Sequence, residues 1–526
     1  MTTPHPVEIE LKLALPPQQV EAFLKRMARR RSAPVQQELI TRYFDTPDFA
    51  LSEQGVALRV RRVGRRWLQT LKTEGERHGG LSQRAEYEMA IARSTPDWTR
   101  FPAEALAWVP DALRAQLVPV FETRFRRTAW LLKGKGGAQI EVALDVGEVR
   151  AGERRQPICE IELELKSGQP DALFALALDW AQQLDCVPLD VSKAERGVRL
   201  AHGEGAAPVK SVPLVLDRAM SVEDGFAAIC QACLAQFQAN LPGVLTSDDI
   251  EYVHQARVAL RRLRAALRLT RRVCGLPDEL MDGLRTLAAA LGTARDWDVL
   301  CGETLPAIAP HYPNNDSWQH GMHALEAHRA EVRAAMQAAM TQAHPGAWLL
   351  ALQRWLLQRG WRLCPSGYAV PEAQRFIQLS PLNKWARQAL QKGHRPIVRG
   401  ARDFAQLQPL QRHALRIAIK RQRYAAEFFQ TLFSERRQAR YQTVLRNAQD
   451  SLGRANDAHI AWGLLTAAHT TPHVLQNVVD RSPLGQADTG PMGDFVLGWL
   501  AAKQVEAADE DSVRHLQDFM KLKPYW

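Results

Sequence analysis

The sequence predicts an α+β protein of several domains, in which a closed β-barrel precedes an all-helical part. Residues 1–200 contain short segments that alternate polar and apolar residues, such as EIELKL and ICEIELEL. This period of two is typical of β-strands. Farther along the chain, apolar residues recur every three or four positions, which is the period of an α-helix. These helical segments include 250–272, 321–343 and 411–433.

The chain divides where its texture changes. With 526 residues it is long enough for two to four domains. Residues 201–216, AHGEGAAPVKSVPLVL, contain glycines and prolines and follow neither period, which indicates a linker. We therefore expect a barrel domain at 1–203, a linker at 204–218 and a helical domain at 219–526.

The composition is that of an ordinary globular protein. Hydrophobic residues make up 46%, and 68 Lys and Arg against 57 Asp and Glu leave a formal charge of +11. The sequence has no run of about 18 apolar residues and no basic leader, so we expect no membrane insertion, no export and a cytoplasmic location. The seven cysteines are scattered and odd in number, which argues against a disulfide framework. Cys230 and Cys233 form a CxxC that fits an apolar helical face better than a metal or redox site.

Charged residues occupy one face of each predicted strand. Because successive side chains of a strand point to opposite faces, residues two apart share a face. The charged faces are Glu8, Glu10 and Lys12; Arg59 and Arg61; Thr70 and Lys72; Arg84, Glu86 and Glu88; Glu141 and Asp145; and Glu160, Glu162 and Glu164. One interpretation is a half-buried sheet whose charged face is hydrated. Acidic and basic residues are segregated by strand, however, which favours a barrel closed around a charged lumen.

Such a lumen has a defined chemistry. Several carboxylates cannot stay ionised together without cations, and ligands that are all oxygen select hard divalent ions, so we expect Mg²⁺ or Mn²⁺. The arginines and lysines in turn need an anion. A compact polyanion that carries its own metal ions, such as a polyphosphate or a nucleoside triphosphate, satisfies both. The sequence contains no GxxxxGK[ST] phosphate loop, and KGKGG (133–137) fits a hairpin turn.

These motifs resemble the CYTH family, the tunnel-fold triphosphatases and class IV adenylate cyclases. EIELK matches the ExExK signature of that family, and the similarity continues through YFDTPD, LRVR, TLK, GGLSQRAEYE, EVALDVGEV, CEIELELKSG and SKAERG, over about the first 200 residues. The resemblance implies an eight-stranded antiparallel barrel, the triphosphate tunnel fold. It implies metal ligands at Glu8, Glu10, Asp145, Glu160, Glu162 and Glu164. It implies phosphate ligands at Arg59, Arg61, Lys72, Arg84 and Lys193, and catalytic roles for Lys12, Glu8 and Glu10.

One further arginine of the tunnel has two candidate positions. In FETRFRRTAW (121–130) an arginine is expected to face the lumen. Residue parity groups Arg124 with Arg126 and puts Arg127 on the opposite face. The register of this strand is open at this point, so Arg124 and Arg127 are alternatives as the triphosphate ligand.

We expect metal-dependent hydrolysis of inorganic triphosphate to pyrophosphate and phosphate. One ion would bridge phosphate oxygens, a second would lower the pKa of a bound water, and the basic wall would stabilise the charge that grows on the phosphates. A cyclase needs a pocket for a nucleobase, and the charged strands show no aromatic residue that would stack an adenine. A nucleoside triphosphatase or a class IV-like adenylate cyclase is the alternative activity.

The helical part contains an internal duplication. HQARVALRRLR (254–264) aligns with HALRIAIKRQR (413–423) at an offset of 159, and LGTARDWD aligns with LGRANDAH at an offset of 161. Two matches at nearly one spacing predict two similar helical units, at about 219–380 and 381–526. The aligned residues recur at steps of three and four, so each helix carries a stripe about 15 Å long of a histidine and three cations. The stripe residues are His254, Arg257, Arg261, Arg264, His413, Arg416, Lys420 and Arg423.

The stripes have two interpretations. A solvated basic helix could simply pair with acidic residues of neighbouring helices, such as Asp296 and Asp457. Residues 250–272 hold seven arginines and one glutamate, however, and like charges one turn apart destabilise a helix unless something binds them. The repetition and the one-sided charge therefore favour binding of a linear polyanion, with an affinity that falls steeply with salt.

The helical motifs resemble the CHAD domain, which is often found behind CYTH domains, over roughly 219–526. The resemblance implies two pseudo-symmetric helical bundles that bind inorganic polyphosphate through the stripe residues, and association with polyphosphate granules. Nucleic acid is the less favoured partner because the stripes lack interleaved aromatic residues. The chain could also be mainly a polyphosphate- or nucleic-acid-binding module with a weak or regulatory tunnel. All six acidic candidates are present, so we expect an active enzyme.

Overall fold

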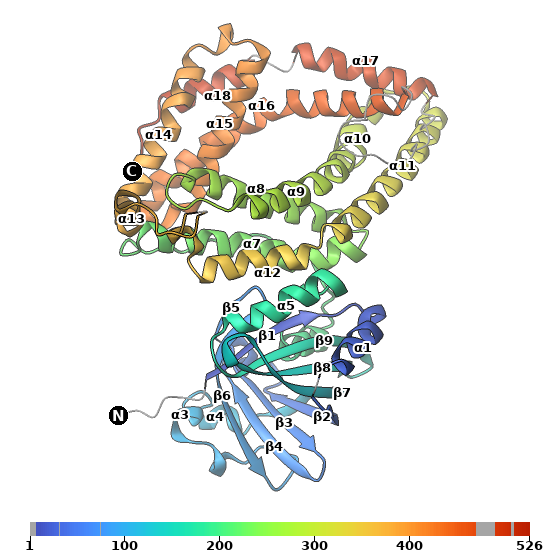
Figure 1. Ribbon diagram of the computed structural model, residues 1–526. Helices are drawn as coiled ribbons and strands as arrows, with labels where there is room; N and C mark the ends of the chain where they lie inside the picture. The colour runs from blue at the N-terminus through green and yellow to red at the C-terminus, as the bar shows by residue number, and fades with distance from the viewer. Residues whose placement is uncertain (1–6, 31, 74, 365, 470–489, 507–509) are drawn as a thin grey trace. The chain divides into compact units, whose positions relative to one another are not determined.

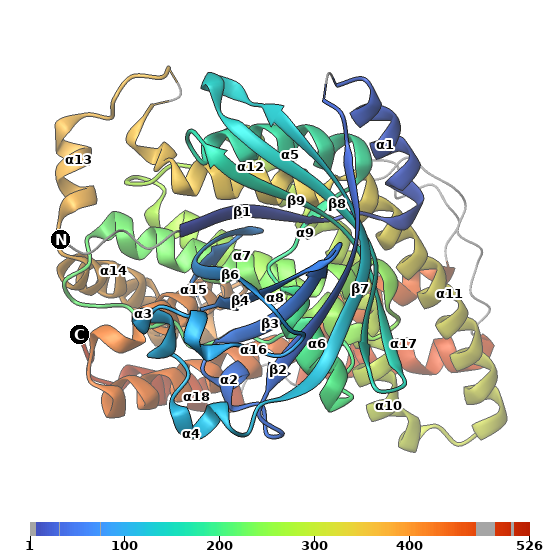
Figure 2. The ribbon, with the colours of Figure 1, turned by 90° about the horizontal axis from the view of Figure 1, so that it is seen from below.

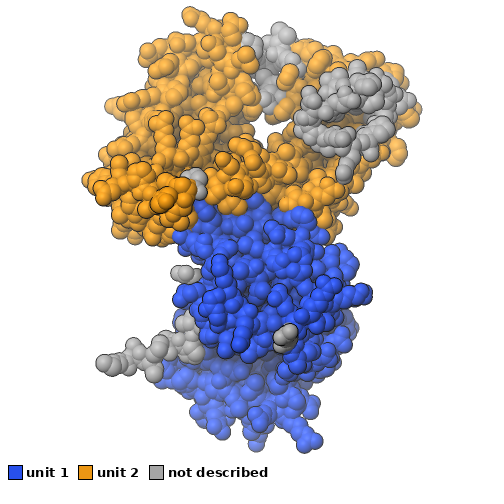
Figure 3. Space-filling view, in the orientation of Figure 1, with its two compact units in different colours: residues 1–207, 344–358 blue, residues 208–343, 359–526 orange. Residues whose placement is uncertain are grey.

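The structure, a computed structural model, describes residues 7–30, 32–73, 75–364, 366–469, 490–506 and 510–526. The chain forms two compact units. The first contains residues 1–207 and 344–358, and the second contains 208–343 and 359–526 (Figure 3). Within the described residues, no helix combines the length and the apolar character that crossing a bilayer requires. All seven cysteines are free thiols, and Cys230 and Cys233 are buried.

Eight antiparallel strands close into a barrel in the first unit (Figure 1, Figure 2). Their order around the barrel is β1 (Val7–Ala14), β9 (Arg154–Ser167), β8 (Gln139–Ala151), β7 (Val118–Lys133), β2 (Val35–Asp45), β3 (Ala57–Val63), β4 (Arg66–Lys72) and β6 (Leu81–Ile91). Pairing of β6 with β1 closes the ring. Two short strands, β5 (Glu76–His78) beside β6 and β10 (Val187–Pro188) beside β1, extend the sheet. The predicted barrel followed by a helical part is confirmed.

Short helices cover the outside of the barrel. They are α1 (Val20–Ala28), α2 (Ala50–Glu53), α3 (Ala103–Leu106), α4 (Asp111–Arg114), α5 (Asp171–Leu184) and α12 (Pro345–Leu357), whereas α6 (Lys193–His202) lies over one end of the interior. The largest outer core lies where α1, α5 and α12 meet the strands. There Phe23 packs edge-on against Trp130 and Trp180, with ring centroids 5.9 and 5.3 Å away. This outer core lets the inner face of the same strands be polar, because the sheet buries its apolar face outward.

One end of the barrel interior is apolar. Leu39, Phe125, Val149 and Ile158 face inward there and pack against Val198 of α6. The charged residues begin farther along the same strands. The lumen is therefore charged over part of its length, and α6 covers its apolar end.

Within the described residues, the regular elements of the second unit are helices, apart from two isolated β-bridges, and one order of helices is repeated. The helices are α7 (Val222–Thr246), α8 (Ile250–Thr270), α9 (Asp278–Val299), α10 (Leu305–Ile308), α11 (Asn315–Gln342), α13 (Glu372–Leu379), α14 (Leu382–Arg402), α15 (Pro409–Phe428), α16 (Glu435–His469), α17 (Gly490–Glu506) and α18 (Glu510–Met520). α8 packs against α7 and α9, as α15 packs against α14 and α16. The duplicated basic motif lies on α8 and α15, which also contact each other.

Candidate active site

The barrel encloses a cavity of about 360 Å³ whose walls carry charges of both signs. The predicted residues that line it are Glu8, Glu10, Lys12, Arg59, Arg61, Lys72, Arg84, Arg127, Glu162, Glu164 and Lys193. Asp145 and Glu160 are more deeply buried, at 0% and 1% exposure, and contact lining residues from behind. The structure therefore brings the predicted tunnel residues together, with one exception.

The exception is Arg124. The inner face of β7 carries Phe121, Thr123, Phe125 and Arg127, which puts Arg124 on the outer face. Its side chain is 48% exposed and pairs with Glu122 at 2.6 Å. Arg127 instead donates from Nε and Nη2 to the two oxygens of Asp145, at 2.7 and 2.6 Å. Of the two alternatives, Arg127 lies in the tunnel.

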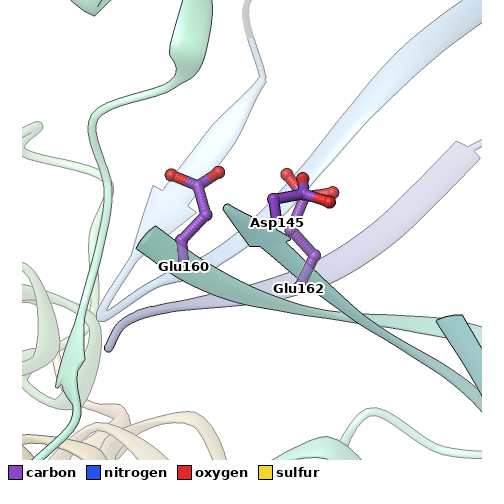
Figure 4. A group of neighbouring side chains, drawn as sticks. All are labelled: Asp145, Glu160 and Glu162. Atoms are coloured by element: carbon purple, nitrogen blue, oxygen red, sulfur yellow. The ribbon is translucent and has the colours of Figure 1, made fainter. Parts of the chain in front are cut away.

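Three of the predicted metal ligands surround a lysine. Carboxylate oxygens of Asp145, Glu160 and Glu162 lie within 4.8 Å of one another (Figure 4). The Lys193 ammonium contacts all three, at 2.7 Å from Asp145 Oδ2 and 2.9 Å from Glu162 Oε1, with Glu160 also in contact. Burial alone would lower the pKa of Lys193, but these carboxylates raise it. Arg127 also contacts Asp145 and Glu162, and Arg196 contacts Glu160, so three cations face the three carboxylates.

The start of α6 places Lys193 at this cluster. Ser192 caps the helix, because its Oγ accepts from Glu195 N at 3.1 Å while the Glu195 carboxylate accepts from Ser192 N at 2.8 Å. This reciprocal capping box sets the direction in which the helix begins. Lys193, the first residue of the helix, then enters the barrel.

Glu8 and Glu10 of β1 are paired with cations from three other positions. Lys72 Nζ lies 2.7 Å from Glu8 Oε2, and Arg84 Nη2 lies 2.7 Å from Glu10 Oε1. Lys12 also contacts Glu10, at 2.7 Å. Although burial opposes ionisation, Lys12 and Lys72 hold the pKa of Glu10 below its usual value. The Glu10 carboxylate is thus kept charged inside the barrel.

Arg61 lies in the cavity without a directly contacting carboxylate among the described residues. Among the described residues it forms no ion pair, and its Nε donates to Thr41 Oγ1 at 3.1 Å. Burial, together with the nearby Arg59 and Arg127, lowers its pKa to about 10. Each of these changes disfavours the guanidinium cation unless an anion joins it. An anion bound beside Arg61 would therefore stabilise its charged form.

Carboxylates also face one another across β1, β9 and β8. Strand register sets Glu164 of β9 directly opposite Glu10 of β1 on one side and Glu141 of β8 on the other. Like charges in such cross-strand positions destabilise the sheet. Burial raises the pKa of Glu164, and Glu8 and Glu141 add to that rise in spite of Lys166. The all-oxygen donor set fits Mg²⁺ or Mn²⁺, which would relieve this repulsion.

Three residues that sequence reasoning did not single out as site residues lie in the cavity or contact its lining. Glu86 pairs with Lys72 at 3.0 Å and with Arg59 at 3.3 Å. Its position two residues after Arg84 places it on the same face of β6, so the alternating pattern could have identified it. Arg77 and Tyr43 line the cavity as well. Tyr43 stacks on Phe121 with 4.5 Å between ring centroids. Arg77 and Tyr43 do not belong to a segment of alternating charged and apolar residues. The alternating pattern that predicted the other tunnel residues therefore could not predict these two.

The basic stripes of α8 and α15 form one cationic cluster in the second unit. Arg261 Nε donates to Tyr424 Oη at 2.7 Å, and the Arg423 guanidinium lies 4.8 Å from the centre of the same ring. Burial, then Arg261, Arg416, Arg257 and Arg423, lower the pKa of Lys420 to about 8. Five predicted cations therefore share one electrostatic environment.

The other stripe residues lie at the edges of this cluster. Arg264 and His413 are exposed, and His254 is half-buried. Arg257 is 3.5 Å from Asp296, and the pKa of Asp296 is raised by burial and by Asp457. Asp296 and Asp457, acidic residues of the duplicated motif, thus lie near the cations of the stripes.

Comparison with known proteins assigns both units to families. Residues 7–198 match the family model of the CYTH domain, and residues 228–466 match that of the CHAD domain. The chain therefore contains a CYTH domain followed by a CHAD domain, which confirms both resemblances and their order. The solved CHAD domain from the plant Ricinus communis is 28% identical, with a TM-score of 0.50, and its match covers 61% of this chain and 99% of that chain.

Two curated relatives match parts of the chain. An inorganic triphosphatase of Haemophilus influenzae is 38% identical over 196 residues, which cover 37% of this chain and 54% of the relative. An uncharacterized protein of Mycobacterium tuberculosis is 29% identical over 305 residues, which cover 54% of this chain and 56% of the relative. The chain thus spans just over half the length of the curated relatives that it matches.

Proposed function

We propose that the tunnel hydrolyses inorganic triphosphate to pyrophosphate and phosphate with Mg²⁺ or Mn²⁺, and that the helical unit binds inorganic polyphosphate. The observation that carries the first part is a cavity inside the barrel in which Arg61, with no ion-pair partner among the described residues, lies among further cations and a row of facing carboxylates. The similarity of residues in this domain to an inorganic triphosphatase supports it.

The arginines bind the phosphate chain. A guanidinium presents paired N–H donors that match two phosphate oxygens, and Arg61 has its charge uncompensated. Arg59 has a buried Nε with no hydrogen-bond partner among the described residues, so it too has a donor to offer. The cations of the wall stabilise the negative charge that moves to the leaving pyrophosphate.

The acidic residues hold the divalent ion. Glu8 and Glu10 of β1 and Glu164 of β9 are the proposed ligands. Their carboxylates repel one another across the two strands, and a divalent ion would relieve that repulsion. The bound ion supplies neutralisation of phosphate charge and acidification of the attacking water. Lys72 and Arg84, now paired with Glu8 and Glu10, become available to phosphate oxygens once those carboxylates have another partner. Lys12, 2.7 Å from Glu10 and 3.8 Å from Glu162, keeps positive charge at the same place.

The cavity favours inorganic triphosphate over a nucleotide. Among the described residues its lining includes a single aromatic ring, that of Tyr43. One face of this ring stacks on Phe121, and the pKa of Tyr43 is lowered by Arg59 and Arg61 although burial opposes this. The ring is thus directed at the phosphate-binding cations, and a nucleobase gains no second stacking partner.

Measuring phosphate release tests the substrate. The purified full-length chain, with Mg²⁺ or Mn²⁺, is expected to release phosphate from triphosphate much faster than from ATP. Equal or faster turnover of ATP, or formation of cyclic AMP, would overturn the assignment. A variant with Glu21→Gln, an exposed glutamate of α1 paired with Lys25, is the matched control and should behave like the parent protein.

The cluster on α8 and α15 supports polyphosphate binding by the helical unit. It brings together cations that lower the pKa of Lys420, and a linear polyanion would relieve their mutual repulsion. Tyr424, its aromatic ring, is 2% exposed and already packed by arginines, so it offers no face to a nucleic-acid base. Labelled polyphosphate should bind at low salt, and duplex DNA at equal phosphate should not displace it. Absence of binding, or displacement by DNA, would overturn this part.

A further inference from the structure

A helix from the CHAD-matched segment is built into the tunnel unit. α12 lies within residues 228–466 of the CHAD match, yet it belongs to the first compact unit and packs on α5 and β10 (Figure 1, Figure 2). Ala347 and Leu350 of α12 are buried in the outer core of the barrel. Arg354 donates to both oxygens of Asp171 on α5, with Nη2 2.7 Å from Oδ2.

The main chain of Lys12 is held on both sides at this edge of the barrel. Its N–H donates to Gly80 O at 2.9 Å, and its C=O accepts from Leu189 N at 2.9 Å. Gly80 belongs to the turn between β5 and β6, and Leu189 directly follows β10. Because these bonds fix the peptides flanking the Lys12 Cα, they set the direction in which its side chain enters the cavity.

α12 supports both of the segments that hold Lys12. Gly346 lies so close to β10 that a Cβ at this position would stand 1.9 Å from Cys186 O. Gln353 packs on the turn, because a Cβ at Gly79 would stand 2.5 Å from its Cγ. Gly79 itself has a φ of 63°, a conformation that favours glycine and keeps the turn open to this contact.

Gln353 acts here through its shape. Its side chain is 2% exposed, and its Nε2 has no hydrogen-bond partner among the described residues. The Nε2 group therefore contributes no hydrogen bond, and packing against the turn is the contact that involves Gly79. A methionine, similar in length and apolar, is therefore expected to replace Gln353 without loss.

We propose that α12 positions Lys12, so that turnover in the tunnel depends on a helix supplied by the CHAD-matched part of the chain. The proposal rests on the proposed function of the tunnel for its activity readout. Gln353 and Gly346 are positioning residues, and neither is among the residues that line the cavity. They act through Gly79–Gly80 and through β10, the two segments whose main chain holds Lys12.

The test compares Gln353→Ala with Gln353→Met in the full-length chain. Gln353→Ala leaves a void beneath the turn, and kcat for triphosphate is expected to fall about 5- to 20-fold with KM within about twofold, because small misplacements of catalytic groups are costly. Hydrogen–deuterium exchange of peptides containing Lys12 or Leu189 should become about tenfold faster. Gln353→Met should restore both quantities. Leu357→Ala, on the exposed face of the same helix, is the matched control and should change neither.

Two results would overturn the proposal. One is parental kcat in Gln353→Ala, and the other is a reduced kcat with unchanged exchange at Lys12. Should Gln353→Ala fail to fold, Gly346→Ala provides the same comparison, because its new Cβ must displace the β10 segment. Should the parent protein release no phosphate from triphosphate, the proposed function fails, while the exchange difference between Gln353→Ala and Gln353→Met still decides whether α12 holds Lys12.

Discussion

The tunnel and the helical surface both gather cations, but a lysine in each is paired differently. Burial alone would lower the pKa of Lys193, yet contact with Asp145 and Glu160 raises it. Lys420 is also partly buried, and with Arg261 and Arg416 nearby its pKa falls to about 8. The same type of residue therefore shows opposite shifts in the two units.

This difference implies that the two units would bind a polyanion by different means. In the tunnel, Lys72, Arg84 and Lys193 already have carboxylate partners, so a bound phosphate chain has to exchange partners with them. On the helices the cations repel one another, and an external anion relieves that repulsion. We expect geometry and metal to control selectivity in the tunnel, and salt concentration to control affinity on the helices.

Replacing Glu8 and Glu10 together by Gln is expected to have the largest effect. A neutral amide is a poor ligand for a divalent ion, so phosphate release from triphosphate should fall at least about 100-fold. Binding of labelled polyphosphate should stay at the parental level because the helical cluster is untouched. Residual metal-dependent turnover near the parental rate would place the metal elsewhere and remove the contrast between the two units.

Lys193→Met tests whether the tunnel depends on its internal balance. The change leaves Asp145 and Glu160 buried with one cation fewer, and the free energy of unfolding should fall by about 3–5 kcal/mol. Lys25→Met removes an exposed ion pair and should cost less than about 1 kcal/mol. Thermal or denaturant unfolding measures both variants.

Divalent ions sharpen this test. Three carboxylate oxygens within 4.8 Å of one another form a candidate metal site once the ammonium is gone. Mg²⁺ or Mn²⁺ should therefore raise the unfolding temperature of Lys193→Met more than that of the parent protein. Equal shifts in the two proteins would indicate that the ion binds only at Glu8, Glu10 and Glu164.

Much of the tunnel could be predicted from residue parity. Alternation alone assigns Glu8, Arg59 and Glu162 to one inner face, because a strand has a period of two residues. The same rule could not choose between Arg124 and Arg127, since it leaves open which face of β7 points inward. That choice depends on Phe125 and the apolar end of the barrel, which are features of packing in three dimensions.

Other parts of the site were not accessible from sequence patterns. The pairing of Lys193 with three candidate metal ligands depends on where α6 begins, which the capping box at Ser192 determines. Membership of α12 in the first unit also left no signal, because an amphipathic helix does not show which surface it covers. On the helices, the duplication predicted the two stripes, but not that Tyr424 lies buried between arginines.

Lys420→Gln is expected to weaken polyphosphate binding without destabilising the fold. Removing one cation from the cluster should lower affinity about five- to tenfold at low salt and reduce the slope of log affinity against log salt by about one. The unfolding temperature should stay the same or rise, because the variant relieves repulsion from Arg261 and Arg416. Arg285→Gln, in an exposed pair with Asp282, is the matched control for binding. A large loss of stability in Lys420→Gln would mean that the helical cluster is balanced like the tunnel.

The smallest expected effect is a pH dependence of polyphosphate binding near pH 8. The pKa of Lys420 is about 8 without ligand, and a bound polyanion favours the ammonium form and raises it. Binding should therefore take up a fraction of a proton near pH 8, and affinity should decline about two- to fivefold from pH 7 to pH 9. Calorimetry in two buffers of different ionisation enthalpy measures the proton uptake.

Lys420→Arg isolates this group because arginine stays charged across the range. The decline in affinity from pH 7 to pH 9 should largely disappear in this variant, while affinity at pH 7 stays close to that of the parent. His254 also titrates beside the cluster, but burial lowers its pKa, so it is already neutral at pH 7 and does not contribute over this interval. An unchanged decline in Lys420→Arg would show that Lys420 keeps its proton from pH 7 to pH 9. The positive charges on α8 and α15 would then be more fully neutralised by nearby groups than the lowered pKa of Lys420 indicates.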